Sequence, residues 1–209
     1  MKTQALKLFA FPFIIVFASL AGCHSGSKDS TAVADSANQK TIAATDSANK
    51  AQVSHSDSSL NANKKLDQDA SKFLVKSYEA GMYEIQLSQL AATNALSPDV
   101  KELAADLVTA HTTINSRMSA IAASANFVLP AAIDAGHQKD LQNIGKLTGA
   151  DFDKKYVNTI VDGHENAVSD YKYAYKNLSP GDTRTFAATT LPKIQDHLAM
   201  AKKVQDRIK

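Results

Sequence analysis

Apolar residues recur at steps of three and four along four stretches of the chain, which polar or proline-containing segments separate. These stretches cover residues 66–93, 98–125, 149–178 and 180–208. Such spacing places the apolar side chains on one stripe of a helix, and each stretch is long enough for a helix of about 25 residues. No segment shows the alternation typical of a half-buried strand. The pattern predicts an all-α fold in which four helices bury their stripes together as a four-helix bundle.

Helix-start signals precede three of these stretches. Ser97-Pro98 offers an N-cap followed by a first-turn proline, while 148–151 and 179–182 fit capping boxes. The connection over residues 127–147 contains a short piece with helical apolar spacing. The sequence does not decide whether this connection is a short loop or a long crossover.

Each predicted stripe is interrupted by one ionisable or imidazole side chain, namely Glu84, His111, His164 and His197. Counted from the predicted turns at 1.5 Å per residue, all four lie within roughly one turn of the same height. Burying a polar group without a partner costs about 1–3 kcal/mol, so such groups need partners. We therefore expect the four side chains to form one layer inside the bundle.

Two interpretations of this layer remain open. Three neutral imidazoles and a carboxylate make a mixed nitrogen and oxygen site that suits one zinc, iron, manganese or copper ion. The alternative is a hydrogen-bonded network in which Glu84 accepts from the histidines and the layer only fixes the helix register.

A dinuclear carboxylate site of the ferritin type is not indicated. Such a site needs Glu-x-x-His on two helices. The residues three positions before the layer histidines are Val108, Val161 and Ile194. At most a mononuclear site is expected, and no second group is placed as a general acid or base, so the sequence predicts no reaction.

The N-terminus carries a different signal. Lys2 and Lys7 precede an apolar run over residues 8–20, and the segment Leu20-Ala21-Gly22-Cys23 follows. This looks like a bacterial lipoprotein signal, which predicts cleavage of residues 1–22 and acylation of Cys23. We expect a lipid-anchored envelope protein in the outer membrane that faces the periplasm.

Processing also changes the charge and the available chemistry. The formal net charge of +2 equals the contribution of the two lysines in the predicted signal peptide, so the mature chain is about neutral. A neutral chain with scattered basic residues does not indicate a nucleic-acid partner. Acylation of the single cysteine leaves no thiol for a disulfide, a nucleophile or a metal.

Residues 23–65 are expected to form a flexible tether. They are rich in Ser, Ala, Asp, Asn and Lys and offer few large apolar groups to offset the entropy of ordering. The sequence Asp-Ser-Ala-Asn occurs at 35–38 and again at 46–49. An eleven-residue period can mark a helical supercoil, but no apolar stripe accompanies it, which favours a low-complexity linker. His24 and His55 lie in this segment, and His137 is expected at the surface of the connection.

Several segments resemble a known family by their order and spacing. They are Tyr83-Glu84-Ile85-Gln86-Leu87, Val108-Thr109-Ala110-His111, Phe152-Asp153-Lys154-Lys155-Tyr156, Asp162-Gly163-His164-Glu165 and Leu191-Pro192-Lys193-Ile194-Gln195-Asp196-His197-Leu198. Together they are similar to the bacterial envelope family catalogued as "domain of unknown function four-one-four-two". The resemblance covers about residues 66–205. It implies a ferritin-like four-helix bundle and an outer-membrane protein, and it implies no established reaction.

The sequence thus predicts a signal peptide over residues 1–22, a lipidated tether over 23–65 and a bundle domain over 66–209. The expected function is that of a lipid-anchored binding or envelope-maintenance protein with one metal ion at the Glu/His layer. The alternative is a non-catalytic structural or interaction module without a metal. The membrane, reached through the anchor, is the expected partner, and no protein partner is indicated.

Overall fold

The computed structural model describes residues 29–52 and 68–209. The predicted signal peptide and Cys23 lie outside the described residues. The described part contains helices and no strand: α1 (Ser30–Gln52), α2 (Gln68–Asn94), α3 (Pro98–Ser124), α4 (Ala135–Ile144), α5 (Gly149–Asn177) and α6 (Asp182–Arg207). The predicted all-α fold is confirmed. Over these residues, no helix combines the length and the apolar character needed to cross a membrane.

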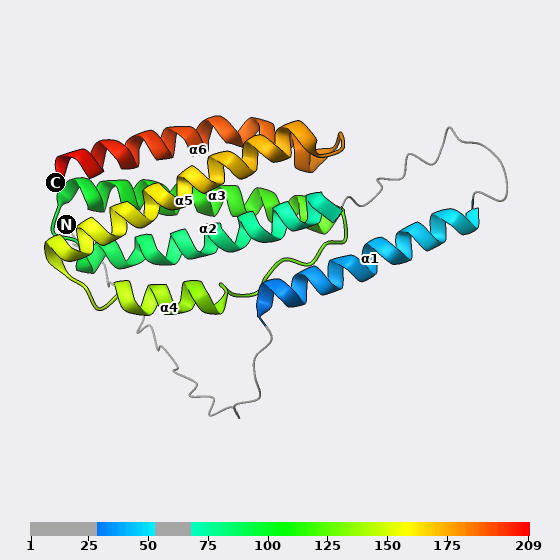
Figure 1. Ribbon diagram of the computed structural model, residues 1–209, viewed down its shortest axis with the longest axis horizontal. Helices are drawn as coiled ribbons and strands as arrows, with labels where there is room; N and C mark the ends of the chain where they lie inside the picture. The colour runs from blue at the N-terminus through cyan, green and yellow to red at the C-terminus, as the bar shows by residue number, and fades with distance from the viewer. Residues whose placement is uncertain (1–28, 53–67) are drawn as a thin grey trace, which may run out of the picture.

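Four long helices, α2, α3, α5 and α6, form the bundle (Figure 1). α2 packs on α3 and α5, and α6 packs on α5 and α3, so each long helix has two neighbours in the bundle. The chain direction in Figure 1 shows that every one of these neighbouring pairs is antiparallel, whereas α3 and α5 run the same way. The predicted four-helix bundle agrees with this arrangement.

The connection from α3 to α5 is a long crossover that returns along the bundle. Asn126 adopts a left-handed backbone with φ of 56° just after α3, which redirects the chain. The crossover then forms α4, which packs against α2 and α5 (Figure 1). Of the two connections that the sequence left open, the structure has the long one. As a result, α2 is covered on its outer side as well as in the bundle.

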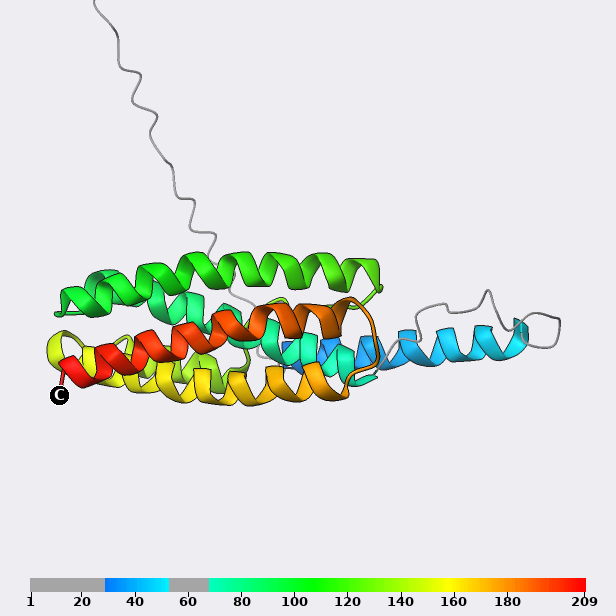
Figure 2. The ribbon, with the colours of Figure 1, turned by 90° about the horizontal axis from the view of Figure 1, so that it is seen from above.

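Two clusters of apolar side chains divide the core along the bundle axis. One contains Leu87, Leu107, Ile160 and Ala201, and the other contains Phe73, Met118, Tyr171 and Ile194, each cluster drawing on all four long helices. In α3, α5 and α6, the layer histidine lies between the segments that feed the two clusters, and in α2 Glu84 directly follows Tyr83 of the first cluster (Figure 2 shows the bundle from above). The polar layer is therefore closed by apolar packing toward both ends of the bundle.

The flexible tether predicted for residues 23–65 is wrong over Ser30–Gln52, which forms α1 and packs against α2. Ala34 and Asn38 are each only 1% exposed. The Asn38 side chain donates to the carbonyl of Val128 at 3.0 Å and accepts from its N–H at 2.7 Å. Small and polar residues at helical spacing let α1 approach the bundle closely, so the contact needs no large apolar stripe.

Polar groups fix the turns between the helices. Asp153 accepts the backbone N–H groups of Leu96 and Ser97 at 3.0 and 2.8 Å, so α5 holds the turn between α2 and α3. Ser97 and Thr148 are the N-cap residues of α3 and α5, as predicted, but their side chains make no capping hydrogen bond. α6 continues through Pro192 without splitting into two helices.

Candidate metal centre

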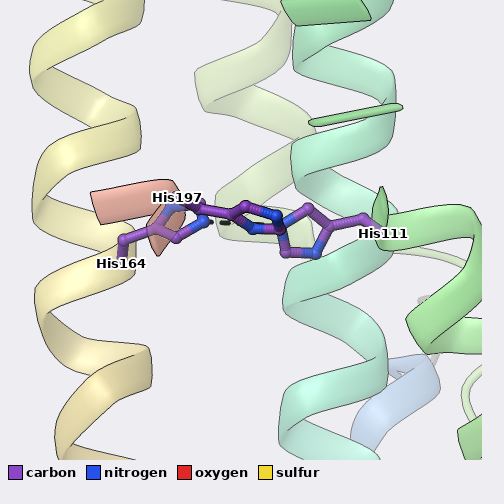
Figure 3. A group of neighbouring side chains, drawn as sticks. All are labelled: His111, His164 and His197. Carbon is purple, nitrogen blue, oxygen red and sulfur yellow. Dashed lines mark hydrogen bonds between the residues drawn. The ribbon is translucent and has the colours of Figure 1, made fainter. Parts of the chain in front are cut away.

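The four predicted layer residues come together in the middle of the bundle, one from each long helix. Glu84 lies on α2, His111 on α3, His164 on α5 and His197 on α6, and all four are buried. Figure 3 shows the three imidazoles pointing toward one another. Their ring centroids are 5.3–5.5 Å apart, and one ring nitrogen from each lies within 4.8 Å of the others. The arrangement brings three imidazole nitrogens close to one point.

Hydrogen bonds orient two of these histidines. His164 Nδ1 lies 3.0 Å from the carbonyl of Ile160 and 3.4 Å from Glu84 Oε1, and since both groups are acceptors, this nitrogen carries the proton. The other ring nitrogen of His164, Nε2, lies 3.4 Å from His111 Nε2. His111 Nε2 also lies 2.8 Å from Glu84 Oε2. Nε2 of His164 therefore faces the centre of the layer.

His197 differs from the other two. Its side chain is buried, and its Nδ1 has no hydrogen-bond partner among the described residues. Burial, reinforced by the neighbouring His111 and His164, lowers the pKa of His197 from 6.5 to about 3. His197 is thus a neutral imidazole at neutral pH. A buried nitrogen without a partner costs about 1–3 kcal/mol.

Glu84 supplies the negative charge of the layer. Burial by itself would raise the pKa of Glu84, but His111 and His164 outweigh this effect and lower it to about 2. Room for the carboxylate comes from α5, since a Cβ on Gly163 would lie 3.1 Å from Glu84 Oε1. Glu84 is therefore an ionised acceptor held between two of the histidines.

A cavity of about 390 Å³ lies beside the layer, lined mainly by α2 and α5. Glu84 and His111 belong to its lining, whereas His164 and His197 do not. Its charged residues further out are Lys76, Asp140, Lys155, Asp162 and Asp170. The layer is buried, but one side of it borders a space large enough for several water molecules or a small ligand.

A second polar cluster joins α2 to α4. Glu79 is 4% exposed, and its two carboxylate oxygens lie 2.8 and 3.0 Å from His137 Nδ1. Glu79 also accepts the N–H of Asp134, while Asp134 caps α4 by accepting the N–H of His137. The ring of His137 stacks on Tyr83 at 4.1 Å. Ligand atoms of Glu79, Asp134 and His137 lie within 4.8 Å of one another, so this group also has the composition of a cation site.

The expectation of an ordinary surface position for His137 is wrong, because the side chain is only 32% exposed and is bonded to a buried carboxylate. The hydrogen bond that His137 donates to Glu79 raises the pKa of His137 above its usual value, although partial burial acts in the opposite direction. The one sequence signal was Asp134 placed three residues before His137, the spacing of a helix N-cap and its third residue.

The comparisons with known proteins agree with the fold. A search of curated proteins finds no match. Among solved structures, the chain is similar to the crystal structure of the DUF305 protein from Streptomyces coelicolor, which is described as a secreted protein. The TM-score is 0.57 at 11% sequence identity, and the match covers 68% of this chain and 96% of that one. This likeness shows a shared helical fold.

The family comparison covers the bundle and agrees with the resemblance found in the sequence. The matching family model spans residues 55–204, which include α2 to α5, all four layer residues and nearly all of α6. α1 lies outside the match. The chain therefore belongs to the family described as domain of unknown function DUF4142.

Proposed function

We propose that this protein is a lipid-anchored envelope protein whose bundle binds one transition metal ion through His111, His164 and His197. The observation that carries the proposal is the convergence of three buried imidazoles within 4.8 Å, one of which, His197, has an Nδ1 without a partner. A purely structural layer gains nothing from leaving that nitrogen unpaired.

The donor set indicates the class of ion. Neutral imidazoles suit zinc, copper, iron and nickel, whereas magnesium and calcium prefer oxygen ligands. Glu84 supports such a site as a ligand or as an acceptor that orients His111, since carboxylates commonly hold the N–H of a metal-bound histidine. An ion bound at His111 Nε2 would replace the proton now shared with Glu84, so binding should release protons.

Elemental analysis and calorimetry of the purified full chain test the proposal. We expect one zinc, iron, manganese or copper ion per chain, bound at micromolar concentration. His164→Ala and His197→Ala should abolish binding, whereas His137→Ala, which removes a histidine of the second cluster, should leave the stoichiometry unchanged. A native chain that binds none of these ions would overturn the proposal.

A second candidate function is a structural or interaction module without a metal. It is favoured by the hydrogen bonds that Glu84 and Ile160 already make to the layer histidines, at 2.8 and 3.0 Å. In that case the layer fixes the register of the four helices. Metal stoichiometry separates the two functions, because only the first requires an ion.

The proposed location depends on the segment Leu20-Ala21-Gly22-Cys23. The similarity to a protein described as secreted supports a position outside the cytoplasm. Cys23→Ser should leave the chain without lipid and release it from the membrane fraction, because acylation of the sulfur precedes cleavage. A variant that is still lipid-modified and still sediments with membranes would contradict the lipoprotein assignment.

A further inference from the structure

We infer that the cavity between α2 and α5 is the passage through which a divalent cation reaches and leaves the histidine layer, with Glu84 as the charged group at its inner end. The inference rests on the proposed metal-binding function. It adds the route of the ion and the residues that control its rate.

The shape of the core favours this route. Along the bundle axis, the two apolar clusters close the layer on both sides. The cavity instead reaches the layer from the side, where Glu84 and His111 line it, and His164 and His197 lie behind them. An ion that arrives through the cavity meets Glu84 and His111 before it meets His164 and His197.

The charges along the cavity favour a cation. The lining contains four carboxylates, from Glu84, Asp140, Asp162 and Asp170, and two lysines, Lys76 and Lys155. Lys76 and Asp170 form an ion pair at 2.7 Å, so their charges cancel in the net charge of the lining. Asp140 and Asp162 then outweigh Lys155 in the outer part, and the ionised Glu84 lies at the inner end. A cleft lined by one sign of charge concentrates the opposite ion and speeds its association.

Tyr83 adds a buried polar residue to the lining of the cavity. The ring of Tyr83 stacks on His137, and Tyr83 as a whole is 6% exposed. The Tyr83 hydroxyl is buried without a hydrogen-bond partner among the described residues, although Tyr83 lines the cavity. A buried hydroxyl without a partner costs free energy, so Tyr83 places an unsatisfied polar residue in the wall of the passage.

Small residues form the wall of the passage. Ala80, Gly81, Gly163 and Ala167 line the cavity, so the backbones of α2 and α5 border the space directly. Ala167 is half-buried, and a leucine at this position would extend into the cavity. Ala188 on α6 is a half-buried helical alanine that does not line the cavity, which makes Ala188→Leu a matched control.

The test is a stopped-flow measurement of Zn²⁺ association and dissociation with the full chain. Ala167→Leu should slow both rates by about tenfold and leave the dissociation constant nearly unchanged, because a blocked passage affects arrival and departure equally. Ala188→Leu should keep the native rates. The combined change Asp140→Asn and Asp162→Asn should slow association and weaken its dependence on salt.

Helicity measured by circular dichroism checks that each variant folds. Thr159→Leu, at another position of the lining, replaces Ala167→Leu if the latter does not fold. Native rates in a folded, metal-binding lining variant would overturn the passage and leave the proposed function intact. Equal slowing by Ala188→Leu would also overturn it, and absence of any Zn²⁺ binding in the native chain would overturn both.

Discussion

Glu84 Oε1 lies so close to α5 that a Cβ on Gly163 would stand 3.1 Å from it. Gly163 directly precedes His164, whose Nδ1 lies 3.4 Å from the same oxygen. Because Gly163 has no side chain, there is room beside α5 for the Glu84 carboxylate, which contacts His164. This relationship links the packing of α2 on α5 to the position of a candidate metal ligand.

Gly163→Ala should weaken metal binding more than it changes folding stability. Alanine gains up to about 1 kcal/mol of helix stability over glycine, which offsets part of the strain from the close contact. Displacement of the carboxylate should reduce the affinity by about tenfold, or 1.4 kcal/mol. Calorimetry of metal binding and denaturant unfolding measure the two effects separately. An unchanged affinity would show that Glu84 does not support the site.

Gly81→Ala is the matched control for that experiment. A Cβ on Gly81 would collide with the side-chain oxygen of Asn115, which packs from α3. We expect the free energy of unfolding to fall by about 1–3 kcal/mol through overpacking. The affinity of the remaining folded protein for the metal should stay close to native, because Asn115 is not a layer residue.

His164→Ala should lower the free energy of unfolding by about 1–3 kcal/mol even when no metal is bound. The side chain is fully buried, so its removal leaves a cavity and takes a partner from the carbonyl of Ile160. Denaturant melts in the presence of a chelator measure the change. A loss well below this range would mean that the layer tolerates an empty position.

The layer could be predicted from the sequence because helical periodicity alone determines it. Apolar steps of three and four fixed the buried face of each long helix, and the rise per residue fixed the heights of Glu84, His111, His164 and His197. The roles of the four could not be predicted in the same way. The protonated nitrogen of His164 and the unpaired nitrogen of His197 depend on ring orientation, which the spacing of residues does not contain.

The bond between His137 and Glu79 should make part of the stability depend on pH. The pKa of His137 is raised in the folded protein, so its contribution is fully present below the unfolded value near 6.5 and is lost as pH rises through the folded value. The difference in unfolding free energy between native protein and His137→Gln should be on the order of 1 kcal/mol larger at pH 5.5 than at pH 9. A difference that is equal at both pH values would show that the pair adds no charge-dependent stability.

The cluster around His137 was not found from the sequence because its partners come from separate elements. Glu79 lies 58 positions earlier on α2, on a side that is buried only because α4 and the crossover cover it. Helical periodicity identifies one buried stripe on each helix of a bundle, and Glu79 falls outside that stripe. The burial of Glu79 could be predicted only if the connection between α3 and α5 was already known to be a long crossover.

His197 should produce the opposite pH effect in protein from which metal has been removed. Its folded pKa of about 3 lies below the unfolded value of 6.5, so the unfolded chain binds the proton first and stability falls as pH drops below 6.5. Between pH 7.5 and 5.5 this effect is at most about 1.4 kcal/mol. Unfolding of native protein and His197→Gln at both pH values isolates it. A variant with the same pH dependence as native protein would show that His197 is not held neutral.

The sequence did not predict α1 because Ser30–Gln52 contains few large apolar side chains. Its buried positions, Ala34 and Asn38, are small or polar, and they pack where the crossover offers backbone groups. Ile42, which lies four residues further, also packs against the core cluster of Phe73 and Tyr171. A composition that is low in apolar residues excludes an independent core, but it does not exclude docking onto one that already exists.

Asn38→Ala should therefore release α1 without unfolding the bundle. The Asn38 amide makes two hydrogen bonds to the backbone of Val128, and their loss should cost about 1–3 kcal/mol of docking free energy. Amide hydrogen exchange over Ser30–Gln52 should become faster, while exchange in α3 and α5 stays native. Ser36→Ala, at an exposed position of the same helix, is the control. Native protection of α1 in the Asn38 variant would mean that its packing against α2, and not this amide, holds it in place.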